Sequence, residues 1–191
     1  MAVKRRVRTA CIFALPPSAA RLRSRISSAV GAARGVGTGG AVAAAATLWW
    51  LYFDNVAENA LRAMTASDDP GRLGRDAYTY GHIPIIAGII VCAVGDKLVI
   101  DSPGDSLSPT ELAVVLGGPI LYLAGHLWFR WVMIHNLGYR RPITIVALAV
   151  LAAIAYVAEP RADLVAVATT AVLVALAIWE FRSARLDPQI S

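Results

Sequence analysis

Long apolar runs separated by short polar segments are the main feature of the chain. Five runs are long enough to cross a bilayer as helices: residues 39–57, 80–100, 111–134, 142–158 and 162–181. At a rise of 1.5 Å per residue, about 20 residues cover the roughly 30 Å of bilayer hydrocarbon. Backbone groups in hydrocarbon must bond within the protein, and the runs lack the alternation of barrel strands. The pattern therefore predicts an all-α fold, a polytopic transmembrane helical bundle of about five spans.

The segments between the runs carry the charges and helix breakers that are typical of loops. They read SDDPGRLGRD, DSPGDSLSP, HNLGYRR and EPRAD. Only 16% of the chain is charged, whereas soluble domains carry about a quarter. We therefore divide the chain into an N-terminal arm (1–38), a transmembrane helical domain (39–181) and a C-terminal tail (182–191).

The N-terminal arm differs in composition from everything that follows it. It contains eight basic residues, and the first acid of the chain is Asp54. Arginines, Pro16 and Pro17 interrupt its few apolar residues, so we expect a poorly ordered arm or at most a helix lying on anionic headgroups. The same composition is found in organelle transit peptides. The expected partners are the lipid bilayer and its anionic headgroups, and no nucleic acid.

The basic residues after the arm are unevenly distributed in a five-span arrangement. Only Lys97 and Arg161 fall on one side. Eight fall on the other: Arg62, Arg72, Arg75, Arg130, Arg140, Arg141, Arg182 and Arg185. Because basic residues collect in cytoplasmic loops, this predicts a multi-pass protein of the cell membrane with a cytoplasmic C-terminus. The basic arm would favour the cytoplasm too, which an odd number of spans does not allow.

Three stretches carry a resemblance to a known family: LWWLYFD (48–54), AYTYGHIPIIAGIIVCAVGDKLVI (77–100) and GGPILYLAGHLWFR (117–130). From about residue 46 to residue 181, the chain resembles the C-terminal half of the bacterial low-temperature-requirement protein A family. The resemblance implies a polytopic protein of the bacterial inner membrane, related to growth in the cold, whose molecular activity is poorly defined. The family's preceding helices are absent here, which suggests an N-terminally truncated copy. A second chain would then supply the missing half, or the chain would form a homo-oligomer.

Ionisable groups inside the spans are the candidate functional residues. A charge at the centre of a bilayer costs roughly 2.5–3.5 kcal/mol on insertion scales, so each needs a physical reason. We expect a polar intramembrane cluster toward the cytoplasmic side, formed by Asp54, Glu58, His82, His126 and Arg130.

Each member of this cluster also has a structural interpretation. Glu58 and Arg130 can extend to the headgroups, and His82 can cap the start of its helix. Asp54 and His126 have short side chains, which favours an internal polar network. We expect Asp54 to face inward and to pair with Arg130 or to hydrogen-bond His126, because an isolated carboxylate is costly at that depth.

The second apolar run has a polar residue at each end of one face. Asp96 follows His82 by 14 residues, close to four helical turns and about 21 Å of rise. Asp96 is therefore a candidate for one end of a pathway along this helix. On the same run Gly81, Gly88 and Gly95 recur every seven residues, which predicts a groove for close helix packing. In the next run, Gly117, Gly118 and Pro119 predict an interruption or kink.

The chain thus predicts a non-enzymatic membrane protein with a transport or proton-coupled role, in which Asp54, His82 and His126 titrate. The alternative is a structural or stress-related membrane component whose polar groups only hold helices together. No catalytic motif or metal-ligand spacing occurs, and the two cysteines, Cys11 and Cys92, do not indicate a disulfide framework. We therefore expect no catalytic residue, metal or cofactor.

The orientation gives a first testable prediction. Alkaline phosphatase fused to the C-terminus should be inactive in bacterial cells, because the basic loops should hold that end in the cytoplasm. An active fusion would contradict the assignment. Deleting residues 1–37 tests whether the basic arm competes with the basic loops in determining the orientation. If it does, the deletion should reverse the orientation, or it should convert a mixture of two orientations into one.

Overall fold

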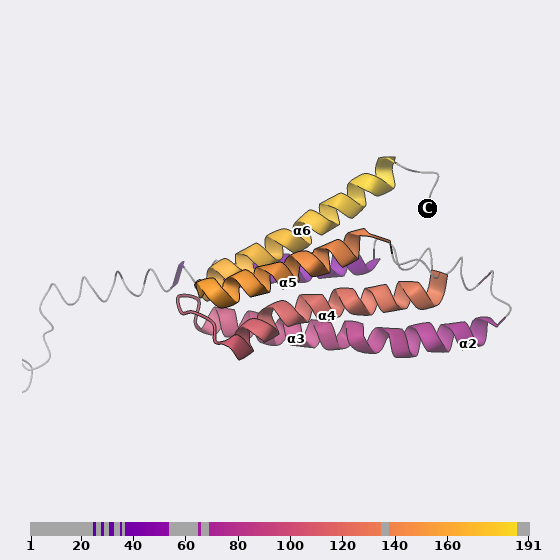
Figure 1. Ribbon diagram of the computed structural model, residues 1–191, viewed down its shortest axis with the longest axis horizontal. Coiled ribbons are helices and arrows are strands. Elements are labelled where there is room, and N and C mark those ends of the chain that lie inside the picture. Colours follow the sequence, from indigo (N-terminus) through magenta and orange to yellow (C-terminus); the bar gives the residue numbers. More distant parts are fainter. Residues whose placement is uncertain are drawn as a thin grey trace, which may run out of the picture.

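The computed structural model describes residues 25, 28, 31, 32, 35, 37–53, 65, 69–134 and 138–186. All regular elements in this part are helical: a helix over residues 37–53, α2 (Pro70–Gly74), the π-helix η1 (Arg75–Tyr80), α3 (Gly81–Asp101), α4 (Pro109–Ile134), α5 (Arg140–Ala158) and α6 (Ala162–Leu186). They form an elongated bundle of roughly parallel and antiparallel helices (Figure 1). The all-α class predicted from the apolar runs is confirmed.

Four of these helices, α3 to α6, are long and apolar enough to cross a membrane. Their bounds lie within a few residues of four of the five predicted spans. The first predicted span, 39–57, is helical through residue 53, and residues 54–57 lie outside the described part. Large apolar side chains stay on the outer surface, such as Ile83, Ile90 and Val146 at 59%, 59% and 61% exposure. In a bilayer these side chains face lipid, so the chain is a multi-pass membrane protein.

The connections at one end of the bundle are tied together. The loops that follow α3 and α5 meet there, where the backbone N–H of Ala162 donates to the carbonyl of Asp105 at 2.8 Å. The N–H of Asp163 donates to the carbonyl of Pro103 at 3.2 Å. These bonds satisfy backbone groups that a helix end leaves unpaired. The C-terminal end of α4, the start of α5 and the C-terminal end of α6 lie at the opposite end (Figure 1).

The start of α4 shows why this helix begins earlier than predicted. The Ser108 hydroxyl and backbone N–H both donate to Glu111 Oε2, at 2.7 and 2.8 Å. This is a capping box, with Pro109 in the first turn. The helix then continues through Gly118 and Pro119, so these residues do not end it.

The segment before α3 corrects one prediction. The predicted loop 67–76 is helical from Pro70 onward, because Asp69 caps this helix by accepting the N–H of Arg72 at 3.0 Å. The helix runs on through η1 into α3. Pro84 cannot donate to the carbonyl four residues before it, and a wider π-turn just upstream relieves that mismatch. His82 therefore lies inside a long helix, and the interpretation that it caps a helix start is wrong.

Helices α3 and α4 approach each other at backbone distance. A Cβ added at Gly88 would lie 2.5 Å from the backbone nitrogen of Tyr122, and one at Gly118 would lie 2.7 Å from that of Cys92. Gly125 meets the α3 backbone at 2.8 Å. The groove predicted from Gly81, Gly88 and Gly95 is confirmed, and α4 contributes glycines of its own at the same seven-residue spacing. Small residues allow this contact in lipid, where van der Waals packing drives helix association.

Polar contacts from three other helices hold helix 37–53 in place. The Tyr122 hydroxyl of α4 donates to the carbonyl of Leu48 at 2.5 Å. Arg141 Nη2 of α5 donates to the carbonyl of Leu51 at 3.2 Å. The Tyr52 hydroxyl and His82 Nε2 of α3 are hydrogen-bonded at 2.9 Å. The helix is thus bound to the bundle by directed bonds that hydrocarbon strengthens by excluding water.

Arg141 also forms a buried ion pair that joins α5 to α6. Its Nε donates to Glu180 Oε1 at 2.9 Å and its Nη2 donates to Oε2 at 3.1 Å. The two side chains are only 2% and 6% exposed. This two-bond geometry is the strong form of an arginine–carboxylate contact.

Gly88→Ala should destabilise the bundle by about 1–3 kcal/mol, because the new methyl group meets the α4 backbone and the helices must separate. Gly117→Ala is the matched control, since a Cβ at Gly117 meets nothing within 4 Å. Thermal unfolding in detergent, followed by tryptophan fluorescence, measures both. Equal unfolding temperatures for the two variants would show that the α3–α4 contact is not tight.

Breaking the Arg141–Glu180 pair should cost about 3–5 kcal/mol for either Arg141→Met or Glu180→Gln, because each leaves a buried polar group alone. The double variant should recover part of the loss. A control is Lys97→Met, whose exposed pair with Asp101 should contribute little. The test compares the unfolding midpoints of the unchanged chain, the two single variants and the double variant, with Lys97→Met as the control. If the losses of the two single variants simply add in the double variant, the two residues act independently.

Candidate functional site

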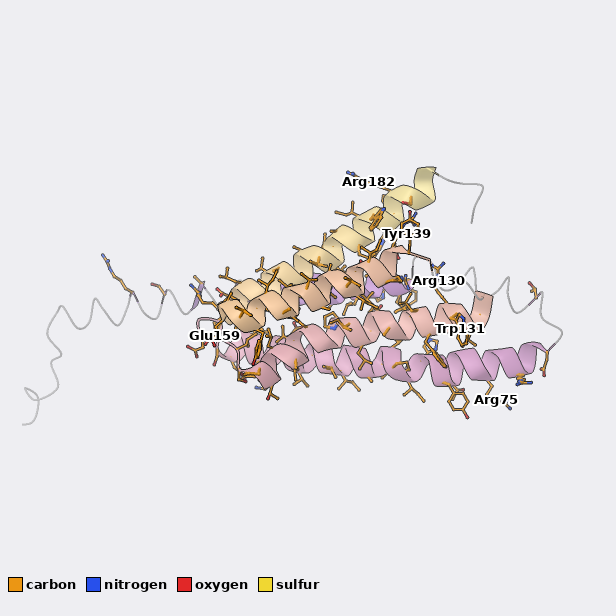
Figure 2. The ribbon with its side chains drawn as sticks, in the orientation of Figure 1. Arg75, Arg130, Trp131, Tyr139, Glu159 and Arg182 are labelled. Carbon is orange, nitrogen blue, oxygen red and sulfur yellow. The ribbon has the colours of Figure 1, made fainter. Side chains whose placement is uncertain are left out.

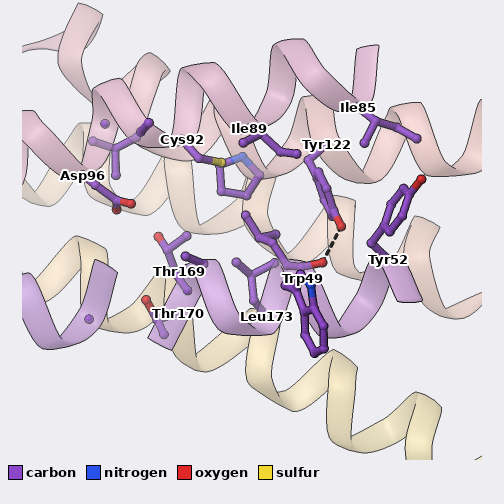
Figure 3. Close-up of a pocket in the computed structure, with 18 of the residues that line it drawn as sticks. Trp49, Tyr52, Ile85, Ile89, Cys92, Asp96, Tyr122, Thr169, Thr170 and Leu173 are labelled. Carbon is purple, nitrogen blue, oxygen red and sulfur yellow. Dashed lines mark hydrogen bonds between the residues drawn. The ribbon is translucent and has the colours of Figure 1, made fainter. Parts of the chain in front are cut away.

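A cavity of about 470 Å³ lies between helix 37–53, α3, α4 and α6 (Figure 3). Its volume falls in the range of ordinary small-molecule sites. It exists because several facing residues are too small to fill the gap between the helices. These are Gly40, Ala44, Ala45, Ala93 and Ala166.

The middle of the cavity is apolar. Ile89 and Leu173 lie there (Figure 3), and Leu48, Ile85 and Val115 add apolar side chains to the rest of the wall. The cavity is open at the surface between helix 37–53 and α3, since the lining residues Trp49 and Ile86 are 60% and 53% exposed. In a membrane this opening faces the hydrocarbon of the bilayer.

One end of the cavity is lined by hydrogen-bond acceptors. Asp96 lies there on α3, across the gap from Thr169 and Thr170 on α6 (Figure 3). The threonine hydroxyls donate to the carbonyls of Val165 and Ala166 in their own helix, at 2.8 and 2.9 Å. Their hydrogens are therefore committed, and their oxygens face the cavity region as acceptors.

The other end contains the hydrogen-bonded pair Tyr52 and His82. The His82 ring also packs edge-on against Phe129, with the ring centroids 5.3 Å apart. Tyr52 belongs to helix 37–53 and His82 to α3, the two helices on either side of the cavity opening. Their hydrogen bond therefore connects these helices across the opening.

His126 is completely buried next to this end. Its ring lies 4.5 Å from that of Tyr122 and 5.8 Å from that of Tyr52, measured between centroids. Neither ring nitrogen has a hydrogen-bond partner within the described part of the chain. Tyr52 thus contacts both histidines, and the structure brings His82 and His126 to one place.

Of the other predicted members of the polar cluster, only Arg130 lies in the described part of the chain. Arg130 is half-buried, one turn beyond His126, and its Nε has no hydrogen-bond partner among the described residues. Asp54 and Glu58 lie outside the described residues, so the pairing of Asp54 with Arg130 or His126 stays a prediction. Asp96 and His82 line the same cavity, as their shared helical face suggested.

Several residues that the structure makes important are not distinctive in the sequence. The charge distribution marks Arg141 only as an orienting loop charge, and no prediction involves Glu180. The available signal was that Glu180 is an acid inside the last apolar run, at the depth where an antiparallel neighbour starts with Arg141. Thr169, Thr170 and Tyr52 gave no such signal, because hydroxyls are common in membrane helices.

The charged and aromatic residues divide between the ends of the bundle much as the loops predicted. Arg75, Arg130, Arg182, Trp131 and Tyr139 lie toward one end (Figure 2). Glu159 lies at the other end. The histidine end of the cavity is nearer the basic end, and Asp96 is nearer the opposite one.

Comparison with known proteins identifies the family of this chain. The model of the bacterial low temperature requirement A protein family matches residues 22–178, which includes part of the segment treated above as an arm. A relative from Rhizobium meliloti (strain 1021), described as uncharacterized protein RA0937, is 31% identical over 135 residues. The match covers 70% of this chain and 32% of the relative, so the chain spans about a third of that protein's length. No solved structure matches. The chain belongs to the bacterial low temperature requirement A family.

Proposed function

We propose that the chain is a non-enzymatic transport protein of the bacterial inner membrane, whose solute site is the cavity between helix 37–53 and α3. One observation carries the proposal. A single cavity joins two polar ends, Asp96 on one side and the Tyr52–His82 pair on the other, along a single helix. Ionisable residues at membrane depth most often serve a pathway for ions or solutes.

The Tyr52–His82 bond gives the cavity a means of responding to protons. A neutral imidazole accepts the tyrosine hydroxyl hydrogen at an unprotonated nitrogen, whereas a doubly protonated ring has no acceptor left. Protonation of His82 would therefore change the contact between helix 37–53 and α3, the helices that flank the opening. His126 packs on the same tyrosine, which links the second histidine to this contact.

The distribution of charge supports an orientation for this transport. We propose that the end with Arg75, Arg130 and Arg182 faces the cytoplasm and contacts anionic headgroups. The His82 end of the cavity would then be the cytoplasmic one, and Asp96 would lie toward the other face.

A structural role is the competing function, and a specific observation favours it. The hydrogen bonds that join helix 37–53 to Tyr122, Arg141 and His82 all run between helices, which is what a purely structural network would also show. The two functions differ in what the loss of the Tyr52 hydroxyl does. A transport protein should lose flux, and a structural component should lose only stability.

Proton movement in proteoliposomes tests the proposal. With a pH-sensitive dye inside and a potassium diffusion potential imposed, the full chain should acidify liposomes several-fold faster than protein-free ones. Tyr52→Phe and His82→Gln should reduce this rate several-fold, because the first removes the hydroxyl of the hydrogen bond and the second replaces the imidazole with an amide that does not take up a proton. Tyr156→Phe, at an exposed tyrosine away from the cavity, should leave the rate unchanged.

Two results would contradict this function. Proton uptake equal to that of protein-free liposomes would remove the transport role. So would a Tyr52→Phe protein with full flux, whose lower unfolding temperature alone would then favour the structural role.

A further inference from the structure

We propose that the cavity binds a lipophilic cation, with its charge at Asp96, Thr169 and Thr170 and its hydrocarbon in the apolar middle. The inference deepens the transport function above, on which it rests for the movement of the ligand, while binding can be measured independently. Three features of the cavity identify this class of ligand: a carboxylate without a partner among the described residues, a set of acceptors and an opening toward lipid.

Asp96 is the carboxylate that needs a cation. It is half-buried in the cavity wall, and within the described part of the chain it makes neither an ion pair nor a side-chain hydrogen bond. Two acids at the same end of the bundle have partners: Asp101 pairs with Lys97, and Asp163 pairs with Arg161 at 2.7 Å. A carboxylate held away from water without a partner is unfavourable, so a bound cation would stabilise it.

The groups around Asp96 favour a positive ligand over a negative or neutral one. The two threonine hydroxyls have already donated their hydrogens to backbone carbonyls, so they offer oxygen lone pairs. The thiol of Cys92, one turn away on α3, is a weak donor at best. An anion would meet acceptors and a carboxylate there, with no strong donor to hold it.

The rest of the cavity favours an organic cation over a hydrated metal ion. A small inorganic ion would have to lose its water against walls formed by Leu48, Ile89 and Val115. A cation carried on hydrocarbon loses little water there, and it partitions into the lipid onto which the cavity opens. Aromatic side chains along the wall, including Tyr122 and Trp49, add apolar surface for the hydrocarbon part of the ligand.

Equilibrium binding of radiolabelled tetraphenylphosphonium to the full chain in phosphatidylcholine nanodiscs tests the proposal. Specific binding above that of empty nanodiscs is expected, and neutral triphenylphosphine oxide should compete at least tenfold less well than the unlabelled cation. Asp96→Asn should weaken binding at least tenfold. Thr170→Val should weaken it several-fold, because it keeps the shape and removes one acceptor. Asp101→Asn, a matched change at an exposed acid on the same helix, should bind within twofold of the unchanged chain.

The outcomes separate binding from transport. Binding at the level of empty nanodiscs, or equal binding by Asp96→Asn and the unchanged chain, overturns the lipophilic cation even if proton flux is observed. Specific binding without any flux in proteoliposomes supports this inference and removes the proposed function instead. A folded profile in gel filtration is required of each variant, and Thr170→Val supplies the test if Asp96→Asn does not fold.

The same cationic chemistry could come from an aminolipid headgroup. Nanodiscs containing phosphatidylethanolamine distinguish this source. Loss of tetraphenylphosphonium binding in these nanodiscs assigns the site to a lipid ammonium, and unchanged binding assigns it to a free lipophilic cation. Both results support a cation on hydrocarbon at Asp96.

Discussion

The contact between Gly88 of α3 and Tyr122 of α4 determines the position of most of the groups described here. With no side chain at Gly88, the backbone of α4 comes so close that an added Cβ would lie 2.5 Å from it. Tyr122 is thereby fixed beside α3, and its hydroxyl reaches the carbonyl of Leu48. Its ring packs on His126 and forms part of the cavity wall. A larger residue at Gly88 would shift α4, and the cavity wall with it.

Exclusion of water explains why the polar groups form bonds between helices. Hydrocarbon offers no alternative partner, so a buried polar side chain bonds to a backbone carbonyl or to an opposite charge on another helix. Arg141 does both, with Glu180 on α6 and the carbonyl of Leu51 on helix 37–53. Such bonds add modest stability when measured against lipid, but they are directional and so determine where each helix stands. In this bundle they fix helix 37–53 at the end that holds the histidines.

The cavity results from the combination of these two effects. Close contact between α3 and α4 draws those helices together, while polar bonds hold helix 37–53 near them. Small residues such as Gly40 and Ala44 leave the space between unfilled. The two ends differ in chemistry. Tyr52 and His82 are hydrogen-bonded to each other at one end, and Asp96 faces threonine oxygens at the other. The cavity thus gives this member of the low temperature requirement A family two polar ends whose chemistry can be tested directly.

The sequence alone determined the fold class, the bounds of most helices and the packing face of α3. Those features depend on local physics: the length of hydrocarbon a helix must cross, the residues that end a helix and the absence of a side chain at Gly88. Asp96 and His82 shared a face by helical period alone. The tertiary structure decided which helices would meet across the bundle. It placed Arg141 against Glu180, Tyr52 against both histidines and two threonines opposite Asp96, because partners far apart in the chain are chosen by the packing of whole helices. The helix start at Pro70 was local as well, yet the charges around it obscured the cap formed by Asp69.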